Sequence, residues 1–146
     1  WEKSNLEIQR KAFIAQINWA KEFKLPIVIH ARDSYNEIFE VLDQVNDENL
    51  KGVFHCFSSS LKDAGRILNY GGFKLGIGGV VTFKNSGLDK VVKNIDIKNI
   101  VLETDSPYLT PTPFRGTRNK SSYIHIIANK LSDIYGISSE EIGNIK

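Results

Sequence analysis

The sequence predicts a parallel α/β fold, and three observations support this class. Short apolar runs rich in β-branched residues alternate about four times with segments of helical periodicity. The connections between them are short, so consecutive strands would lie parallel with helices packed against the sheet. The apolar runs are continuous, which is typical of strands buried on both faces. Four such strands could form an open sheet or half of a barrel.

Length and composition are those of a globular protein. A chain of 146 residues with 41% hydrophobic and 25% charged residues predicts one domain, and a net charge of +2 is too small to indicate a nucleic-acid partner by itself. One cysteine excludes an internal disulfide and favours a reducing compartment, so we expect a cytoplasmic protein. No apolar run approaches the ~18 residues of a membrane helix, and no membrane partner is expected. The chain has no methionine and begins at Trp1, which predicts a part of a larger protein.

The first two helix–strand units have clear boundary signals. A capping box, Ser4-Asn5-Leu6-Glu7, predicts the start of the first helix, because serine and glutamate can bind free N–H groups of the first turn. The helix should end before Leu25-Pro26, since the residue before proline disfavours helical geometry. Residues 26–30 then form a strand, a second capping box at 34–37 opens the next helix, and residues 52–57 form the second strand.

The next two units repeat the pattern. Ser60 should cap a helix that runs through Leu68, and residues 73–77 form a third strand. A short helix is expected near 87–94, and a fourth strand at 100–104.

The carboxyl-terminal part begins with a polar loop over 106–120, rich in Pro, Arg and Gly. A helix is expected from about Ser122 to Tyr135, with Gly136 as its stop signal. Ser138 then begins a last helix.

Three metal-binding residue types stand where apolar runs end: His30, His55 and Asp105. Parallel strands bring matching ends to one rim, so these side chains would lie together. Two imidazoles and a carboxylate suit Zn, Mn or Fe, and a carboxylate-rich remainder would suit Mg. Asp105 could also hold the attacking water and take its proton. The alternative for each histidine is a hydrogen-bonded structural residue, and for Asp105 an Asx turn or helix cap.

Glu103 precedes Asp105 by two residues and would face the same side of a regular strand. It is therefore a candidate partner of the metal ligands or a further catalytic base. The alternative is a strand carboxylate paired with a neighbouring Lys or Arg.

Basic and aromatic residues near the same rim predict phosphate binding. Arg32 should share the face of His30, and Arg115 and Arg118 lie in the 106–120 loop. Guanidinium groups match phosphate oxygens in pairs, and Tyr108 could stack on a base or sugar. A solvated basic loop with packing aromatics is the alternative.

Other features do not predict chemistry. The run Gly76-Ile77-Gly78-Gly79 lacks the order of a nucleotide-binding loop. Cys56 should face away from His55 by strand alternation, as a buried structural thiol. His125 falls inside the last long helix, as a surface or packing residue. A serine-hydrolase elbow is not found in the sequence.

Four motifs resemble those of the TatD family of metal-dependent deoxyribonucleases. They are Pro-x-Val-Ile-His-x-Arg-Asp at 26–33, Phe-His-Cys-Phe-Ser at 54–58, Glu-Thr-Asp-Ser-Pro-Tyr-Leu at 103–109 and Arg-Gly-x-Arg-Asn at 115–119. They occur in the family's order and cover essentially the whole chain. The resemblance implies a (β/α)8 TIM barrel of the metal-dependent hydrolase type, of which about four β/α units are present here.

The resemblance also implies roles for residues. His30 and His55 match metal ligands, Asp105 matches a ligand and base, and Glu103 matches the acidic residue beside it. Residues Arg115, Arg118 and Asn119 match the loop that holds substrate phosphate. The implied activity is hydrolysis of DNA phosphodiester bonds, typically as a Mg-dependent exonuclease, with one or two divalent ions, Mg, Zn or Mn.

The sequence also departs from the family pattern. The His-x-His motif of the first strand and the glutamate of Gly-Glu-x-Gly-Leu-Asp would both precede Trp1, so residues 1–146 are expected to be the carboxyl-terminal part of one barrel domain whose amino-terminal half is missing. Lys120-Ser121-Ser122 replaces the usual acidic-then-proline continuation, which indicates a changed helix start. We expect this segment alone to be inactive. Two alternatives stay open: a metal-dependent amidohydrolase-type enzyme with a small substrate, and a non-catalytic fragment.

Overall fold

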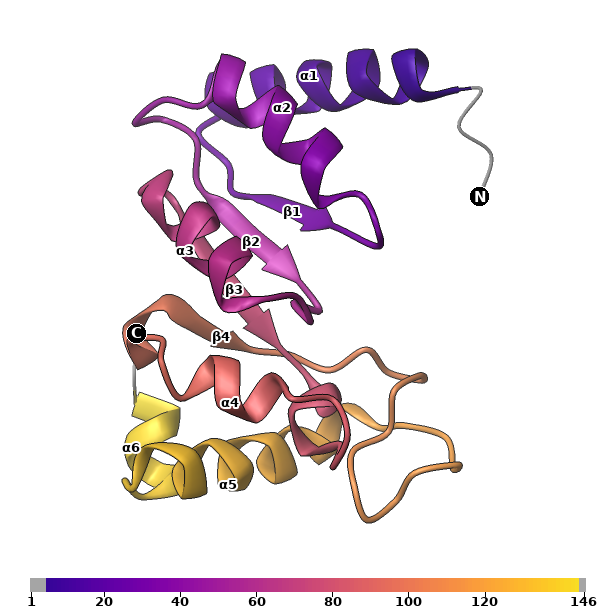
Figure 1. The fold of residues 1–146 in the computed structure, drawn as a ribbon, viewed down its shortest axis with the longest axis vertical. Coiled ribbons are helices and arrows are strands. Elements are labelled where there is room, and N and C mark those ends of the chain that lie inside the picture. The colour runs from indigo at the N-terminus through magenta and orange to yellow at the C-terminus, as the bar shows by residue number, and fades with distance from the viewer. Residues whose placement is uncertain (1–4, 145–146) are drawn as a thin grey trace.

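The computed structural model describes residues 5–144, which form one parallel sheet with helices against it (Figure 1). The strands are β1 (Ile27–His30), β2 (Gly52–His55), β3 (Phe73–Ile77) and β4 (Ile100–Leu102). The α-helices are α1 (Leu6–Glu22), α2 (Tyr35–Val45), α3 (Leu61–Asn69), α4 (Leu88–Val92), α5 (Ile124–Tyr135) and α6 (Ser139–Asn144). Three 3-10 helices complete the elements: η1 (Gly79–Thr82), η2 (Ile97–Asn99) and η3 (Ser121–Tyr123).

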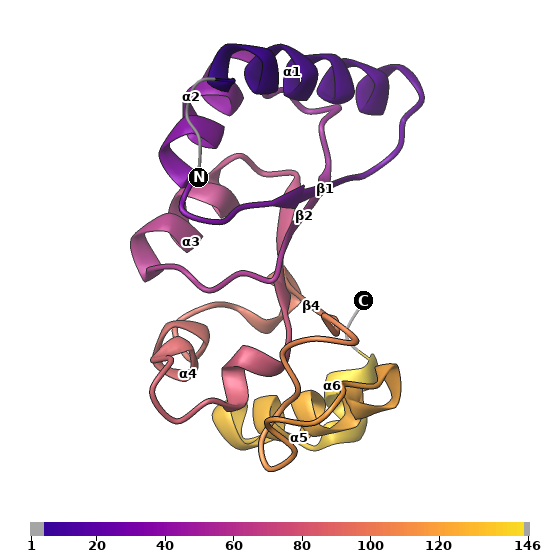
Figure 2. The ribbon, with the colours of Figure 1, turned by 90° about the vertical axis from the view of Figure 1, so that its right-hand side faces the viewer.

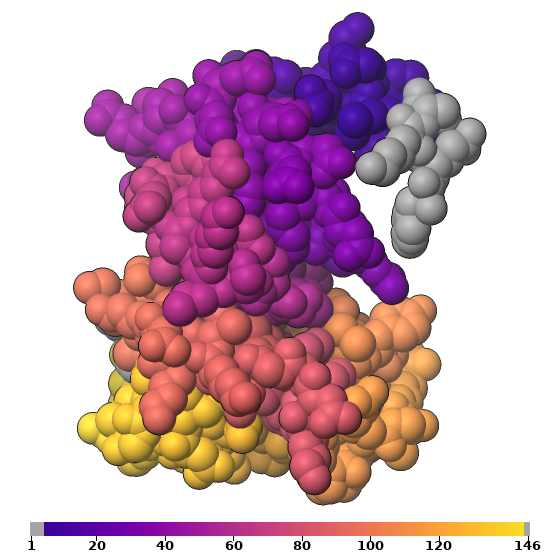
Figure 3. Space-filling view, in the orientation of Figure 1, coloured from indigo at the N-terminus to yellow at the C-terminus, as the bar shows by residue number. Residues whose placement is uncertain are grey.

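The sheet has the order β1-β2-β3-β4, and every neighbouring pair is parallel. This confirms the predicted alternation of strands and helices. Helices α2, α3 and α4 lie on one side of the sheet, with α1 and α5 at its two ends (Figure 2). In the space-filling view, helix side chains close over this face (Figure 3).

The two faces of the sheet differ in burial. Phe54, Leu75 and Ile77 on the helix-covered face are 0% exposed. On the other face, Val28 is 67% exposed and Val101 is 40% exposed. The prediction that the strands are buried on both faces is therefore wrong within the described residues, because the helices of this segment cover one face.

Helix boundaries follow the predicted signals with one exception among the described caps. The Ser60 hydroxyl accepts a hydrogen bond from the N–H of Asp63 at 3.1 Å, as expected. Ser34 precedes α2 as predicted, but its side chain makes no capping hydrogen bond. Gly136 ends α5 with φ of +69°, a left-handed conformation that suits glycine. The capping residue predicted at Ser4 lies outside the described residues.

Two strands end earlier than predicted, so Cys56 and Glu103 lie just beyond the strand ends. Strand β2 ends at His55 because Cys56 has a positive φ of 51°. Strand β4 ends at Leu102, although the N–H of Glu103 still donates to the carbonyl of Ile77 at 3.2 Å. No helix within residues 5–144 is both long and apolar enough to cross a membrane.

Candidate functional site

His30 and His55 lie side by side at the carboxyl ends of β1 and β2. They are register partners in the sheet, and their ring centroids are 5.8 Å apart. Residues at partner positions of parallel strands point to the same face, which here is the face without helices. The structure therefore brings together the two histidines that the sequence singled out.

Glu103 and Asp105 reach His55 from the segment after β4. The Nδ1 of His55 lies 2.9 Å from Oε2 of Glu103, and its Nε2 lies 3.1 Å from Oδ1 of Asp105. The backbone N–H of Cys56 donates to the other oxygen of Glu103. The partners of Glu103 are therefore a histidine and a backbone amide, and not the Lys or Arg of the alternative interpretation.

The carboxylates set the electrostatics of this cluster. Burial disfavours a charged His55, but the hydrogen bonds and negative charges of Glu103 and Asp105 outweigh it and raise the pKa of His55. Burial, together with the same two charges, raises the pKa of the Cys56 thiol to about 11. The charge of Asp105 contributes to this shift, so the thiol lies near the site and the prediction that Cys56 faces away from it is wrong. Its positive φ breaks the strand alternation on which that prediction rested.

The donor set fits part of a divalent-metal site. His30, His55 and Asp105 offer two imidazoles and a carboxylate near one sheet edge, the ligand types that Zn and Mn prefer. Within residues 5–144, however, no three His, Cys, Asp or Glu side chains converge closely enough to hold an ion. These residues can therefore supply some ligands of a metal site, and a complete site needs donors from elsewhere.

The loop that follows Asp105 is held together from inside by Asn119. This residue is 3% exposed. Its side-chain amide N–H donates to the carbonyl of Tyr108 at 2.6 Å, and its Oδ1 accepts from the N–H of Lys120 at 2.8 Å. The hydroxyl of Ser106 donates to the carbonyl of Asn119 at 3.0 Å. The structure thus places Asn119 inside the loop, with its amide bonded to the loop's own backbone.

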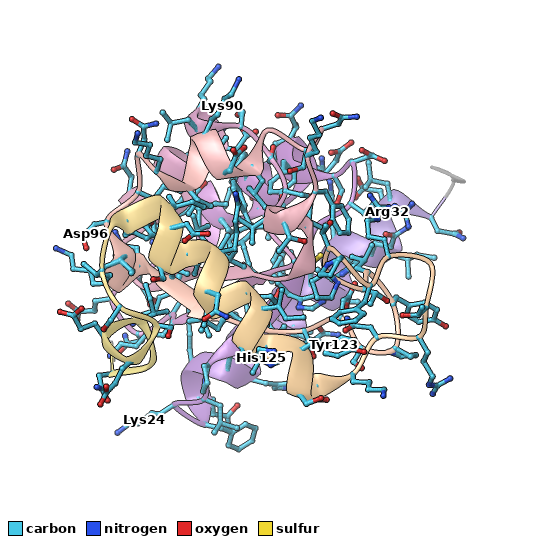
Figure 4. The ribbon with its side chains drawn as sticks, turned by 90° about the horizontal axis from the view of Figure 1, so that it is seen from below. Lys24, Arg32, Lys90, Asp96, Tyr123 and His125 are labelled. Atoms are coloured by element: carbon cyan, nitrogen blue, oxygen red, sulfur yellow. The ribbon has the colours of Figure 1, made fainter. Side chains whose placement is uncertain are left out.

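The predicted phosphate-binding residues lie around the same end of the sheet. Arg32 lies on the side of the 106–120 loop, and Asp96, which precedes β4, lies on the opposite side (Figure 4). The guanidinium carbon of Arg115 is 3.8 Å from the ring centroid of Phe83. Arg118 is exposed, and Tyr108 is 73% exposed. Arg115 is therefore partly used to pack the loop, whereas Arg118 and Tyr108 face solvent.

Sequence reasoning missed three contributors to this arrangement. Phe83 packs under Arg115, the amide of Cys56 binds Glu103, and Gly76 lies against the Glu103 carboxylate. The glycine run 76–79 is the sequence signal for this space, although it lacks the order of a nucleotide-binding loop. His125 is exposed on α5 and bonds to the backbone of Ser122, as expected for a surface residue.

Comparisons with known proteins place the chain in a family. The model of the family described as TatD related DNase matches residues 1–146. The uncharacterized metal-dependent hydrolase YabD of Bacillus subtilis is 41% identical over 99% of this chain and 57% of its own length. YcfH of Escherichia coli, with the same description, is 30% identical over 94% of this chain and 52% of its own length.

Solved structures agree with the fold. YjjV, a TatD homolog from Escherichia coli, superposes with a TM-score of 0.89 and 26% identity, over 99% of this chain and 56% of that protein. A TatD family hydrolase from Entamoeba histolytica gives a TM-score of 0.80 at 24% identity, over 94% of this chain and 54% of that protein. The chain spans about half the length of the relatives it matches, so its four parallel β/α units correspond to part of a TIM barrel. The chain therefore belongs to the TatD-related DNase family.

Proposed function

We propose that the protein containing this chain is a divalent-metal-dependent hydrolase that cleaves phosphodiester bonds in DNA. The observation that supports this most directly is the gathering of His30, His55 and Asp105 at the carboxyl ends of parallel strands. Relatives that are similar to this chain in sequence are described as metal-dependent hydrolases, which also supports the proposal.

His30, His55 and Asp105 would hold the ion, with further ligands from the part of the barrel that lies outside this chain. A bound divalent ion, Mg, Zn or Mn, supplies Lewis acidity and positive charge at that point. The carboxylate of Asp105 would orient the attacking water and accept its proton, because it lies 3.1 Å from the ring nitrogen of His55 that would bind the ion.

The 106–120 loop would bind the substrate. Phosphate charge would be neutralised by Arg118, by the edge of Arg115, and by Arg32 from the loop after β1. The exposed ring of Tyr108 offers a stacking surface for a base. Asn119 would act through the shape of this loop, since its amide is bonded internally. The proposed partners are DNA and the amino-terminal half of the same barrel. We also propose that the protein is cytoplasmic and has no membrane partner.

The test uses the full-length protein that contains this chain, with single-stranded DNA and Mg, Mn or Zn in separate assays. We expect metal-dependent cleavage that His55→Ala lowers by at least about a hundredfold, because a ligand is lost. His125→Ala is the matched control, since this histidine is exposed and bonds to local backbone. Cleavage of a small ester or amide without cleavage of DNA would overturn the proposed substrate, and activity unchanged by His55→Ala would overturn the proposed metal site.

A further inference from the structure

Strand β3 contributes to the site through a residue without a side chain. Gly76 is the register partner of Val101 on β4, on the sheet face that carries His55 and Glu103. A Cβ atom at Gly76 would lie 2.6 Å from Cδ and 2.7 Å from Oε1 of Glu103. The Glu103 carboxylate therefore occupies the space that any other residue at position 76 would fill.

Both oxygens of that carboxylate are committed to hydrogen bonds. One accepts from the backbone N–H of Cys56, and the other lies 2.9 Å from Nδ1 of His55. The Glu103 side chain is 17% exposed, and its own N–H is bonded to Ile77 of β3. Such a group is held on both sides and is poorly placed to accept a proton from a substrate or water.

We propose that Glu103 is a positioning residue that fixes the ring of His55, and that Gly76 is required because it provides the space for Glu103. This inference rests on the proposed metal site. A carboxylate can only accept, so Nδ1 of His55 donates its proton to Glu103. Nε2 faces Asp105 at 3.1 Å, donates to it while it carries a proton, and is the nitrogen that would bind the ion once that proton is released. Glu103 thereby sets both the tautomer and the orientation of the ring that would bind the ion.

The substitution Gly76→Ala can disturb the position of Glu103 without disturbing the fold. In Gly76→Ala the atoms that must move are the far end of a flexible glutamate side chain, so the backbone can stay in place. In Gly78→Ala the new Cβ would lie 3.6 Å from the carbonyl oxygen of Glu103, an ordinary contact. Both positions are buried and two residues apart, which makes Gly78→Ala a matched control.

The experiment uses the full-length protein and two readouts besides activity. The first is the Nδ1–H signal of His55 in the metal-free protein, observed by ¹⁵N NMR after labelling of histidine and assigned with His55→Gln. The second is the dissociation constant for Co²⁺, measured by the visible absorption of the bound ion. Thermal unfolding is recorded for each variant.

We expect Gly76→Ala to lose or shift the Nδ1–H signal and to weaken Co²⁺ binding by about 10–100-fold, the usual effect of removing a partner of a ligating histidine. Gly78→Ala should keep both at wild-type values. In a Glu103→Ala background, Gly76→Ala should have no further effect, because the glycine acts only through Glu103.

The proposal is overturned if Gly76→Ala retains the wild-type signal, or if the two glycine variants weaken Co²⁺ binding equally. A wild-type protein that binds no Co²⁺ would refute the proposed metal site, while the NMR signal would still test the contact between Glu103 and His55. A wild-type protein that binds Co²⁺ but does not cleave DNA would refute only the proposed substrate.

Discussion

Replacement of Asn119 by alanine is expected to loosen the 106–120 loop and to destabilise the protein. Asn119 is 3% exposed, and its amide bonds to Tyr108 and Lys120 with donor–acceptor distances of 2.6 and 2.8 Å. Alanine leaves a carbonyl and an N–H without these partners, each worth about 1–3 kcal/mol if it stays buried. Because water can reach part of this loop, we expect a total loss of about 1–2 kcal/mol in the free energy of unfolding.

The assay combines urea denaturation with limited trypsin digestion, since the loop contains Arg115, Arg118 and Lys120 as cleavage sites. Asn119→Ala should be cut faster in this loop than the wild type. Asn119→Asp should be cut at least as fast as Asn119→Ala, because its carboxylate still accepts from Lys120 but places a second acceptor against the carbonyl of Tyr108. Asn129→Ala is the control, as this asparagine is exposed on α5. Wild-type stability together with wild-type cleavage of the loop in Asn119→Ala would refute the bracing role.

Other expected outcomes test the caps, the helix contacts and the loop. Ser60→Ala should cost about 1 kcal/mol and Ser34→Ala close to nothing, because only the former hydroxyl accepts a capping bond; equal losses in urea denaturation would contradict this. Burial raises the pKa of Tyr135 from 10.0 to about 12, so its contribution to stability is present below pH 10 and lost as pH rises toward 12. Tyr135→Phe should remove this pH dependence of stability and lower the free energy of unfolding by about 1 kcal/mol, since the hydroxyl contacts two carbonyl oxygens at and just after the end of α4. A Tyr135→Phe protein that keeps the wild-type pH profile of unfolding would refute this. Phe83→Leu should weaken the packing of Arg115 by about 0.5–1 kcal/mol, and the loss should disappear in an Arg115→Ala background, as a double-mutant cycle can measure.

The sequence by itself determined the fold class, the order of the elements and the rim on which the candidate ligands lie. Periodicity and capping signals are local, so Ser60 and Gly136 could be assigned from their neighbours. The placement of His30 beside His55 also followed from the sequence, because parallel strands of similar length must bring their carboxyl ends together.

Only the tertiary structure decided how the side chains of the candidate site engage one another. The bond between His55 and Glu103 joins residues 48 positions apart, and the space for it comes from Gly76 on a third segment. The direction of Cys56 depends on a positive φ that no alternation rule anticipates, and the burial of Asn119 depends on how the whole loop closes. Residue types and spacing therefore predict which groups reach an edge of the sheet, while contacts between distant segments determine which atoms of those groups are free to bind and react.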